Sequence, residues 1–471
     1  MQYISTRGQA PKIGFCDVLL AGLARDGGLY VPETWPKLGE SAVGAAAASA
    51  KNSAAASYAQ KAASIMSPFV GAEIDQQIFE KLCAEAYSTF RHSEVAPLVE
   101  IGPNEYLLEL FHGPTLAFKD VALQLVGKLF DHVLTQRNER VMIVGATSGD
   151  TGGAAFDGIA ACRNVDIVML YPNNRVSDVQ RRQMTTLTAP NVHAVAVDGT
   201  FDDCQDLVKA MFNDQEFRDA NQLSAVNSIN WVRVMAQVVY YITAIEKLGR
   251  SAVFSVPTGN FGNVLAGWIA KQMGAQIEGF VVASNTNDIL TRFFESKQMV
   301  ANEVVPTLSP SMDIQVSSNF ERLLFETNNR DGAETAKQLT DFRATGKLEV
   351  GASVYQKWFE GAFVGRRCND EQTLATMQDV YKQSAMLIDP HTAVGLSAAR
   401  QSAGVDYPKN MPMITLATAH PAKFPDAVRR ATGQTPKLPE HLADLMSRPE
   451  RSVSLPNDLG AVQAFVASCR K

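Results

Sequence analysis

Residues 109–120 read ELFHGPTLAFKD, and this stretch places one lysine, Lys119, directly behind an apolar run at residues 116–118. A Gly-Pro turn precedes the run, and a helix is expected to begin at the lysine. Apolar neighbours exclude water from an amine, which lowers its pKa and makes it a better nucleophile. Lys119 is therefore a candidate nucleophile. The alternative is an exposed lysine that starts a helix over residues 119–130.

Two glycine-rich segments downstream share one pattern. Residues 141–155 read VMIVGATSGDTGGAA and residues 253–267 read VFSVPTGNFGNVLAG. Each consists of an apolar β-branched strand, a loop of small residues and an apolar helix start. Backbone amides at such a helix start bind anions, although ordinary strand-to-helix turns also use glycine. The second loop does not match the GxGxxG pattern of dinucleotide sites, and the chain has no GxxxxGK[ST] nucleotide loop.

The segments PTLAFKD, SGDTG and PTGNFGN, in this order, resemble threonine synthase, a family of fold-type II pyridoxal phosphate enzymes. The resemblance runs from DGGLYVP at residues 26–32 to TAHPAKF at residues 418–424, and the length is similar to that of the bacterial and fungal branch. It implies an α/β fold like that of the tryptophan synthase β subunit, with parallel and mixed sheets flanked by helices and an N-terminal, mainly helical domain. It also implies a Schiff base between Lys119 and the cofactor, pyridoxal 5'-phosphate.

The same resemblance implies further cofactor contacts. The cofactor phosphate would be held by the loop of Gly259, Asn260, Phe261, Gly262 and Asn263, largely through backbone amides. Thr418 would face the pyridine nitrogen, where a neutral hydroxyl leaves that nitrogen less protonated than a carboxylate would. The residues alone leave an alternative for each assignment. The glycine loop would then be a plain strand-to-helix turn, and the Thr418 hydroxyl would bond the backbone at the end of a strand.

Substrate contacts are implied at two other segments. The substrate's anionic ends would meet Thr147, Ser148, Asp150 and Thr151, with the Asp150 carboxylate pointed away or bonded to amides. The segment NSINWVR at residues 227–233 would contact a substrate phosphate through Asn227 and Arg233, since a guanidinium pairs bidentately with phosphate. The alternative for residues 147–151 is an ordinary strand-to-helix turn, and the alternative for Arg233 is a position on a helix surface.

The composition is that of a globular enzyme, with 471 residues, 46% hydrophobic and 20% charged. A net charge of −6 argues against nucleic acid or an acidic membrane as a partner. Six scattered cysteines lack metal-ligand spacing, so reduced thiols and no metal are expected. Without a signal peptide or an apolar window of about 18 residues, a cytoplasmic location and no membrane span are expected.

The N-terminal domain is expected over residues 1–95, with helices at residues 15–23, 52–66 and 74–90 and a flexible or helical segment near residues 43–51.

The catalytic core is expected over residues 96–471, and the alternation of strands and helices predicts parallel sheets. A smaller, mobile α/β subdomain is expected at about 135–240 and a large one in the remainder. Polar residues 307–322 are expected to form surface structure, and residues 371–400 a helix, a strand and a helix.

The resemblance implies an enzyme that would convert O-phospho-L-homoserine and water to L-threonine and phosphate, by β,γ-elimination and replacement, and would be a monomer or homodimer. Three alternatives stay open. A phospho-lyase would release 2-oxobutyrate from the same substrate, and a serine or threonine dehydratase would not need Asn227 and Arg233. A non-catalytic phosphate-binding relative would not need Lys119.

Overall fold

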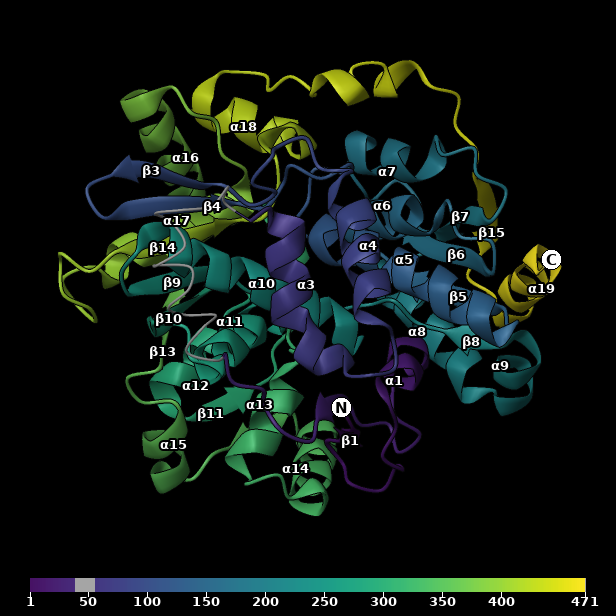
Figure 1. Cartoon of the computed structure of the whole chain (residues 1–471). Coiled ribbons are helices and arrows are strands. Elements are labelled where there is room, and N and C mark those ends of the chain that lie inside the picture. The colour runs from purple at the N-terminus through teal and green to yellow at the C-terminus, as the bar shows by residue number, and fades with distance from the viewer. Residues whose placement is uncertain (39–55, 471) are drawn as a thin grey trace.

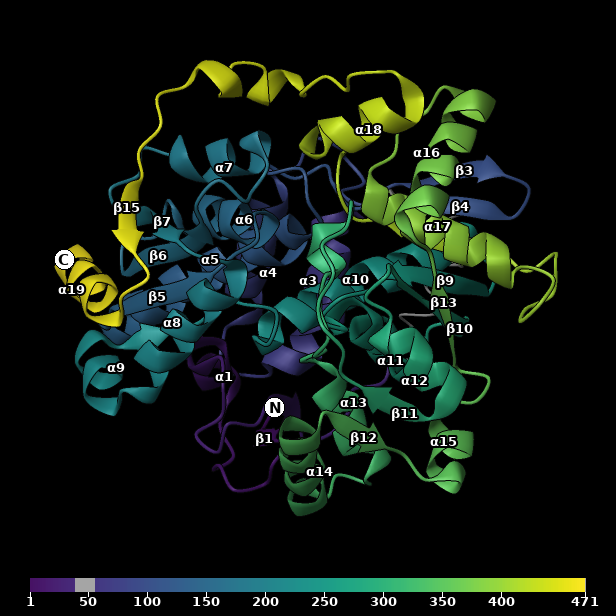
Figure 2. The same cartoon turned by 180° about the vertical axis from the view of Figure 1, so that it is seen from behind.

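The structure, a computed structural model, describes residues 1–38 and 56–470. Two main sheets, each flanked by helices, lie side by side in the molecule, and two pairs of short strands, β1 with β2 and β11 with β12, lie outside them (Figures 1 and 2). The larger sheet has the strand order β13-β10-β9-β14-β4-β3, and the smaller has the order β15-β7-β6-β5-β8. The α/β class and the parallel and mixed sheets predicted from the sequence are therefore confirmed.

The larger sheet is mixed. The β3–β4 pair is antiparallel, and all its other neighbouring strands run parallel. Its strands are β3 (Leu98–Gly102), β4 (Glu105–Glu109), β9 (Ala252–Pro257), β10 (Ile277–Ser284), β13 (Phe363–Arg367) and β14 (Met413–Ala417).

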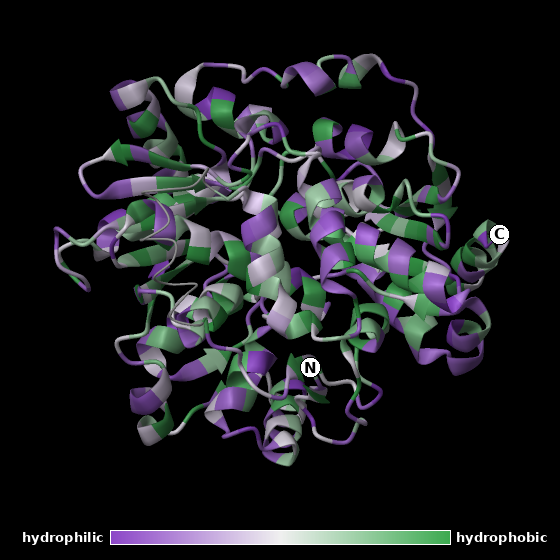
Figure 3. Ribbon diagram, viewed as in Figure 1, coloured by the Kyte–Doolittle hydropathy of each residue, from purple (hydrophilic) through white to green (hydrophobic). Residues whose placement is uncertain are grey.

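The smaller sheet is parallel throughout. Its strands are β5 (Val141–Ala146), β6 (Val165–Pro172), β7 (Val192–Asp198), β8 (Leu223–Ser224) and β15 (Val453–Pro456). Every residue of β6 is buried, as expected for a strand covered on both faces. Hydrophobic residues gather in the strands and on the inner faces of the helices (Figure 3). The last strand, β15, was not predicted. It brings chain from far beyond residue 240 into the sheet of the expected smaller subdomain.

The helices of the core cover both sheets. They are α5 (Lys119–Arg137), α6 (Asp150–Ile159), α7 (Asp178–Thr185), α8 (Phe201–Asn213), α9 (Gln215–Asn221), α10 (Trp231–Leu248), α11 (Gly262–Met273), α12 (Ile289–Ser296), α13 (Phe320–Thr327), α14 (Gly332–Thr345), α15 (Ala352–Trp358), α16 (Asp370–Ser384), α17 (Pro390–Ser402), α18 (Pro425–Thr432) and α19 (Leu459–Cys469). Short elements complete the core, namely the strands β11 (Gln298–Val300) and β12 (Lys347–Glu349) and the 3-10 turns η1 (Pro310–Met312), η2 (Pro421–Lys423), η3 (Glu440–Leu442) and η4 (Leu445–Ser447).

The prediction of a strand between α16 and α17 is wrong, because these residues form no strand. The carboxylate of Asp389 accepts hydrogen bonds from the backbone N–H groups of His391 and Thr392, and Pro390 occupies the first helical position. An N-cap aspartate followed by proline starts a helix. The apolar residues after it therefore belong to α17.

The N-terminal residues form β1 (Tyr3–Ser5), α1 (Phe15–Ala21), β2 (Tyr30–Pro32), α3 (Tyr58–Val70) and α4 (Gln76–Tyr87). The helix expected over 52–66 begins later, at Tyr58, where Ser57 and Gln60 form a capping box, and it continues to Val70. The segment near 43–51 lies outside the described residues. Helix α4 packs on α5 and α3 on α10, so these helices share a core with the catalytic part.

Two glycines bring α5 and α6 into close contact. A Cβ atom on Gly127 would lie 1.9 Å from the carbonyl oxygen of Gly158, and a Cβ on Gly158 would lie 2.4 Å from that of Leu123. Helix α5 begins at Lys119 and α6 at Asp150, and each precedes its contact glycine by the same number of positions. The glycine contact therefore sets how near these two charged residues lie. Among the described residues, no helix has the length and apolar character needed to cross a bilayer.

Candidate functional site

The predicted motifs converge because their loops follow the carboxyl ends of parallel strands. Residues 110–118 follow β4, residues 258–261 follow β9, and residues 418–420 follow β14, which lies between those two strands. The loop at residues 147–149 follows β5 of the smaller sheet. In open α/β sheets this edge is where ligands bind.

Lys119 lies at the centre of a buried cluster of charges. Its Nζ donates to Asp150 Oδ2 at 3.0 Å, and Lys423 Nζ lies 3.1 Å from Asp150 Oδ1. Gln180 Nε2 also donates to Asp150 Oδ1 at 2.9 Å, and Ser311 Oγ to Oδ2 at 3.3 Å. The relative exposures of Lys119, Asp150 and Lys423 are 7%, 4% and 0%. Asp150 is thus bonded to one amide, as expected, but mainly to two lysines.

Burial lowers the pKa of Lys119, against the opposing effect of the Asp150 carboxylate, and the positive charges of Lys423 and Arg233 lower it further. Burial by itself raises the pKa of Asp150, but Lys119 and Lys423 hold it well below the ordinary value. The cluster therefore contains a firmly ionised carboxylate beside an amine that gives up its proton more easily than a solvated lysine.

The segment at residues 307–319 lies against the second glycine loop, so the expectation of surface structure there is wrong. Ser317 Oγ donates to the carbonyl of Gly259 at 2.8 Å, and the Asn319 N–H donates to that of Asn260 at 3.0 Å. A Cβ on Gly259 would lie 2.7 Å from the carbonyl oxygen of Ser311. The segment's polar residues bond to the loop's backbone, which is why a polar sequence is buried here.

Arg233 is buried near Lys119 with unused hydrogen-bonding capacity. Its Nη1 donates to the Val226 carbonyl at 3.2 Å, and its Nε has no partner among the described residues. Burial lowers the pKa of Arg233 to about 10, which leaves it cationic at neutral pH. In contrast, Asn227 is exposed, and its Oδ1 accepts from the backbone N–H of Ile229 at 3.3 Å.

Asn263, at the start of α11, also has a buried donor without a partner. Its Nδ2 is unpaired among the described residues, whereas its Oδ1 accepts from the hydroxyls of Tyr240 and Tyr241. Phe261 caps the helix in the left-handed conformation, with φ at +61°. The free backbone N–H groups of the first turn add further donors.

Two threonines occupy different settings. The Thr147 hydroxyl accepts from the N–H groups of Gly149 and Gly152, both at 2.9 Å, and so shapes its own loop. Thr418 is buried, and its carbonyl accepts from the Phe118 N–H at 2.9 Å, which fixes it beside Lys119. Ser148 and Thr151 remain partly exposed.

Comparison with known proteins identifies the family. The model for the N-terminus of threonine synthase matches residues 2–87, that for pyridoxal-phosphate dependent enzymes matches residues 94–416, and that for the threonine synthase C-terminal region matches residues 392–466. Threonine synthase from Pseudomonas aeruginosa is 53% identical over 99% of this chain and 98% of its own length. The chain belongs to the threonine synthase family.

Solved structures of threonine synthase agree with this identification. The pyridoxal-phosphate-bound structure from Brucella melitensis aligns with a TM-score of 0.94 at 50% identity and covers 100% of both chains. The structure from yeast aligns with a TM-score of 0.91 at 38% identity and covers 99% of this chain and 98% of its own. The protein is a pyridoxal-phosphate-dependent enzyme.

The residues present fit this cofactor. The unpaired Asn263 Nδ2 and the first-turn amides of α11 supply donors for a phosphate. Lys119 supplies a buried amine at the same edge of the sheets. The set has the anion-binding and amine chemistry that pyridoxal phosphate requires.

Four residues of this candidate site were missed in the sequence. They are Gln180, Ser311, His391 and Lys423. His391 bonds Asp389 through Nδ1 at 2.7 Å, and its Nε2 accepts the Ser311 N–H at 3.2 Å, which holds Ser311 near Asp150. Lys423 was within reach of sequence reasoning, because it stands in the HPAKF part of the motif that contains Thr418.

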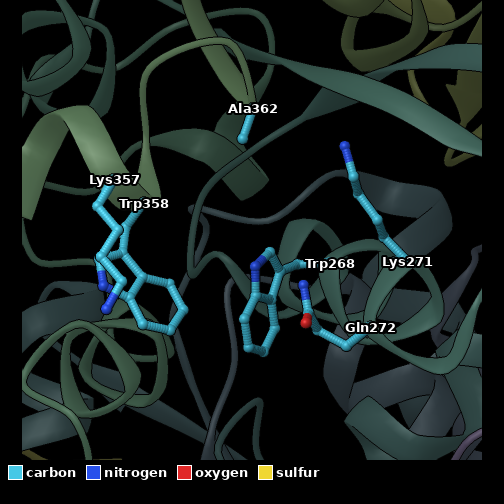
Figure 4. A pocket seen from close by; sticks show the side chains of 6 residues that line it. All are labelled: Trp268, Lys271, Gln272, Lys357, Trp358 and Ala362. Carbon is cyan, nitrogen blue, oxygen red and sulfur yellow. The ribbon is translucent and has the colours of Figure 1, made fainter.

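A hollow on the surface is separate from these motifs. It is lined by Trp268, Lys271, Gln272, Lys357, Trp358 and Ala362, and none of these residues belongs to the predicted site (Figure 4).

Proposed function

We propose that Lys119 bonds to pyridoxal phosphate and moves the protons of the threonine synthase reaction, in which O-phospho-L-homoserine and water become L-threonine and phosphate. The observation that carries the proposal is the Lys119 amine, buried 3.0 Å from Asp150 at the edge where the motif loops meet. A desolvated lysine with a lowered pKa has the neutral amine that such chemistry needs.

The cofactor would be held at two ends. The loop from Gly259 to Asn263, in which Asn260, Phe261 and Gly262 lie between, would bind the phosphate through backbone amides and Asn263 Nδ2. Thr418 would meet the pyridine nitrogen, and the backbone bond from Phe118 supports this because it keeps Thr418 next to Lys119.

The substrate would be held by the remaining predicted residues. Arg233 is a buried cation with an unpaired Nε, which supports a role in binding the substrate phosphate. Ser148 and Thr151 would donate to the carboxylate from the loop that Thr147 shapes. Asn227 would reach the phosphate from the exposed end of the NSINWVR segment. Asp150 would act on Lys119 rather than on an anion.

When bound, pyridoxal phosphate supplies an electron sink for the substrate's Cα. The Lys119 amine would remove the Cα proton, pass it to the substrate's phosphate group, and then remove a Cβ proton, while Asp150 keeps that amine in place. Phosphate leaves from Cγ towards Arg233, water adds at Cβ, and Lys119 returns protons to carbon. Movement of the smaller subdomain, at about residues 135–240, would exclude other water during these steps.

Product analysis tests the proposal. Purified protein is incubated with O-phospho-L-homoserine, and threonine, 2-oxobutyrate and phosphate are measured. We expect threonine and phosphate in equal amounts, and neither product nor the cofactor's visible absorption band in Lys119→Ala. Lys128→Ala, on the same helix and 3.8 Å from Glu85, is the matched control and should keep both. 2-Oxobutyrate in place of threonine would assign a phospho-lyase instead.

We also propose that the enzyme works in the cytoplasm as a monomer or homodimer and without nucleic acid. The net charge of −6 and the six free, buried cysteines support this. Light scattering of the purified protein would give the oligomeric state.

A further inference from the structure

Asp150 is shared by two lysines from different parts of the chain. Lys423, from η2, lies at one carboxylate oxygen at 3.1 Å, and Lys119, from the start of α5, lies at the other at 3.0 Å. When all three groups are ionised, the cluster carries one positive charge in excess. Since such a charge is costly in a buried place, one of the two ammonium groups is under pressure to lose a proton.

The two lysines differ in how their protons are bonded. Lys423 Nζ donates to the Thr115 carbonyl at 2.8 Å and to Gln183 Oε1 at 2.6 Å, in addition to its contact with Asp150. Two of its three protons therefore have hydrogen-bond acceptors, and the ammonium group also forms an ion pair with Asp150. Lys119 Nζ donates to Asp150 and lies 4.8 Å from the centre of the Phe118 ring. Lys423 is therefore held by more hydrogen bonds than Lys119, which donates only to Asp150 among the described residues.

We propose that Lys423 is a positioning residue, whose buried positive charge keeps Asp150 ionised and the Lys119 nitrogen free of its extra proton. The inference rests on the proposed role of Lys119. When that nitrogen is neutral, Asp150 and Lys423 balance each other, and the cluster has no net charge. Lys423 thus lets a carboxylate orient the Lys119 nitrogen without holding a proton on it.

Charged groups from every neighbouring element act on this cluster. Asp150 from α6, Lys423 from η2 and Arg233 from α10 face Lys119, and His391 from α17 also faces Asp150. Asp120 from α5 and His420, which precedes η2, both face Lys423. Among the groups that face Lys119, Asp150 alone favours its proton, and Lys423 and Arg233 oppose it.

The test is a pH titration of the visible absorption band of the holoenzyme, which reports protonation at the Lys119 nitrogen. Lys423→Met keeps a long unbranched side chain and removes the charge. We expect the midpoint to rise by about 1–2 pH units, and the acid limb of kcat to move in the same direction. Asp150→Asn should move the midpoint the opposite way. Lys271→Met, which removes a lysine that bonds the Glu278 carbonyl away from this cluster, should leave the midpoint unchanged.

A second variant covers the case in which Lys423→Met does not fold. Gln183→Glu leaves Lys423 in place and puts a carboxylate where its amide acceptor lies, so the midpoint should again rise. A midpoint that stays at the wild-type value or falls, in whichever of the two variants folds, would overturn the inference. Failure of the proposed role of Lys119 gives a different result from failure of this inference. If Lys119 does not bond the cofactor, the wild-type absorption band persists in Lys119→Ala.

Discussion

The glycine contact between α5 and α6 predicts that Gly127→Ala damages both stability and catalysis. The new Cβ would lie 1.9 Å from the Gly158 carbonyl oxygen, whereas ordinary contacts begin at 3.4 Å. The two helices must then separate locally by roughly 1.5 Å, and overpacking of this kind costs about 1–3 kcal/mol.

The same displacement reaches the site, because α5 and α6 begin at Lys119 and Asp150. A shift of that size would take the 3.0 Å contact between their side chains beyond hydrogen-bonding distance. We therefore expect a lower kcat together with the lower stability.

Urea denaturation followed by circular dichroism measures the first effect, and steady-state release of phosphate measures the second. Gly460→Ala is the matched control. Its new Cβ, also in a helix, would have its nearest contact at 3.4 Å, with Asp458. If Gly127→Ala unfolds at the same urea concentration as this control and keeps the wild-type kcat, the reasoning is wrong.

Three further predictions concern single side chains. Arg233→Met should raise KM for O-phospho-L-homoserine by about 30–100-fold, which corresponds to the loss of roughly 2–3 kcal/mol of charged hydrogen bonding. Steady-state kinetics measures this change, and an unchanged KM would show that Arg233 does not bind the substrate phosphate. Thr418→Val should weaken cofactor binding about 10-fold, since one hydrogen bond is lost, and titration of the apoprotein with pyridoxal phosphate measures this; equal affinity would argue against contact with the pyridine nitrogen. Burial, reinforced by His112, lowers the pKa of His420 from 6.5 to about 4, so the unfolded chain binds a proton between these values that the folded chain does not. The wild type should thus lose stability as pH falls from 6.5 to 4, and His420→Asn should lose less. Urea midpoints measured at several pH values test this, and equal losses would contradict the lowered pKa of His420.

The sequence predicted the elements that depend on local pattern. The helix at Lys119 begins where expected, and the apolar runs of β5, β6 and β9 are strands as predicted. These predictions succeeded because the apolar run of a buried parallel strand, and the turn that precedes a helix, both consist of consecutive residues.

Contacts between distant segments were not predictable in this way. Polar residues such as Ser317 and Asn319 are typical of a surface loop, and only the fold shows that they bond to the glycine loop. The partner of Asp150 is a similar case. Lys423 lies far from Asp150 in sequence, and no spacing rule indicates that one carboxylate holds two lysines.

Strand β15 has a consequence for how the chain is made. Both views show the chain after α18 crossing from the larger sheet to the far edge of the smaller one (Figures 1 and 2). Strand β7 leaves the ribosome about 250 residues before β15, its outer partner, and domains begin to fold during synthesis. For most of translation, the outer edge of β7 is therefore an unpaired template that can pair with another nascent chain. Aggregation during synthesis, rather than weakness of the finished enzyme, is the hazard that this order of assembly creates.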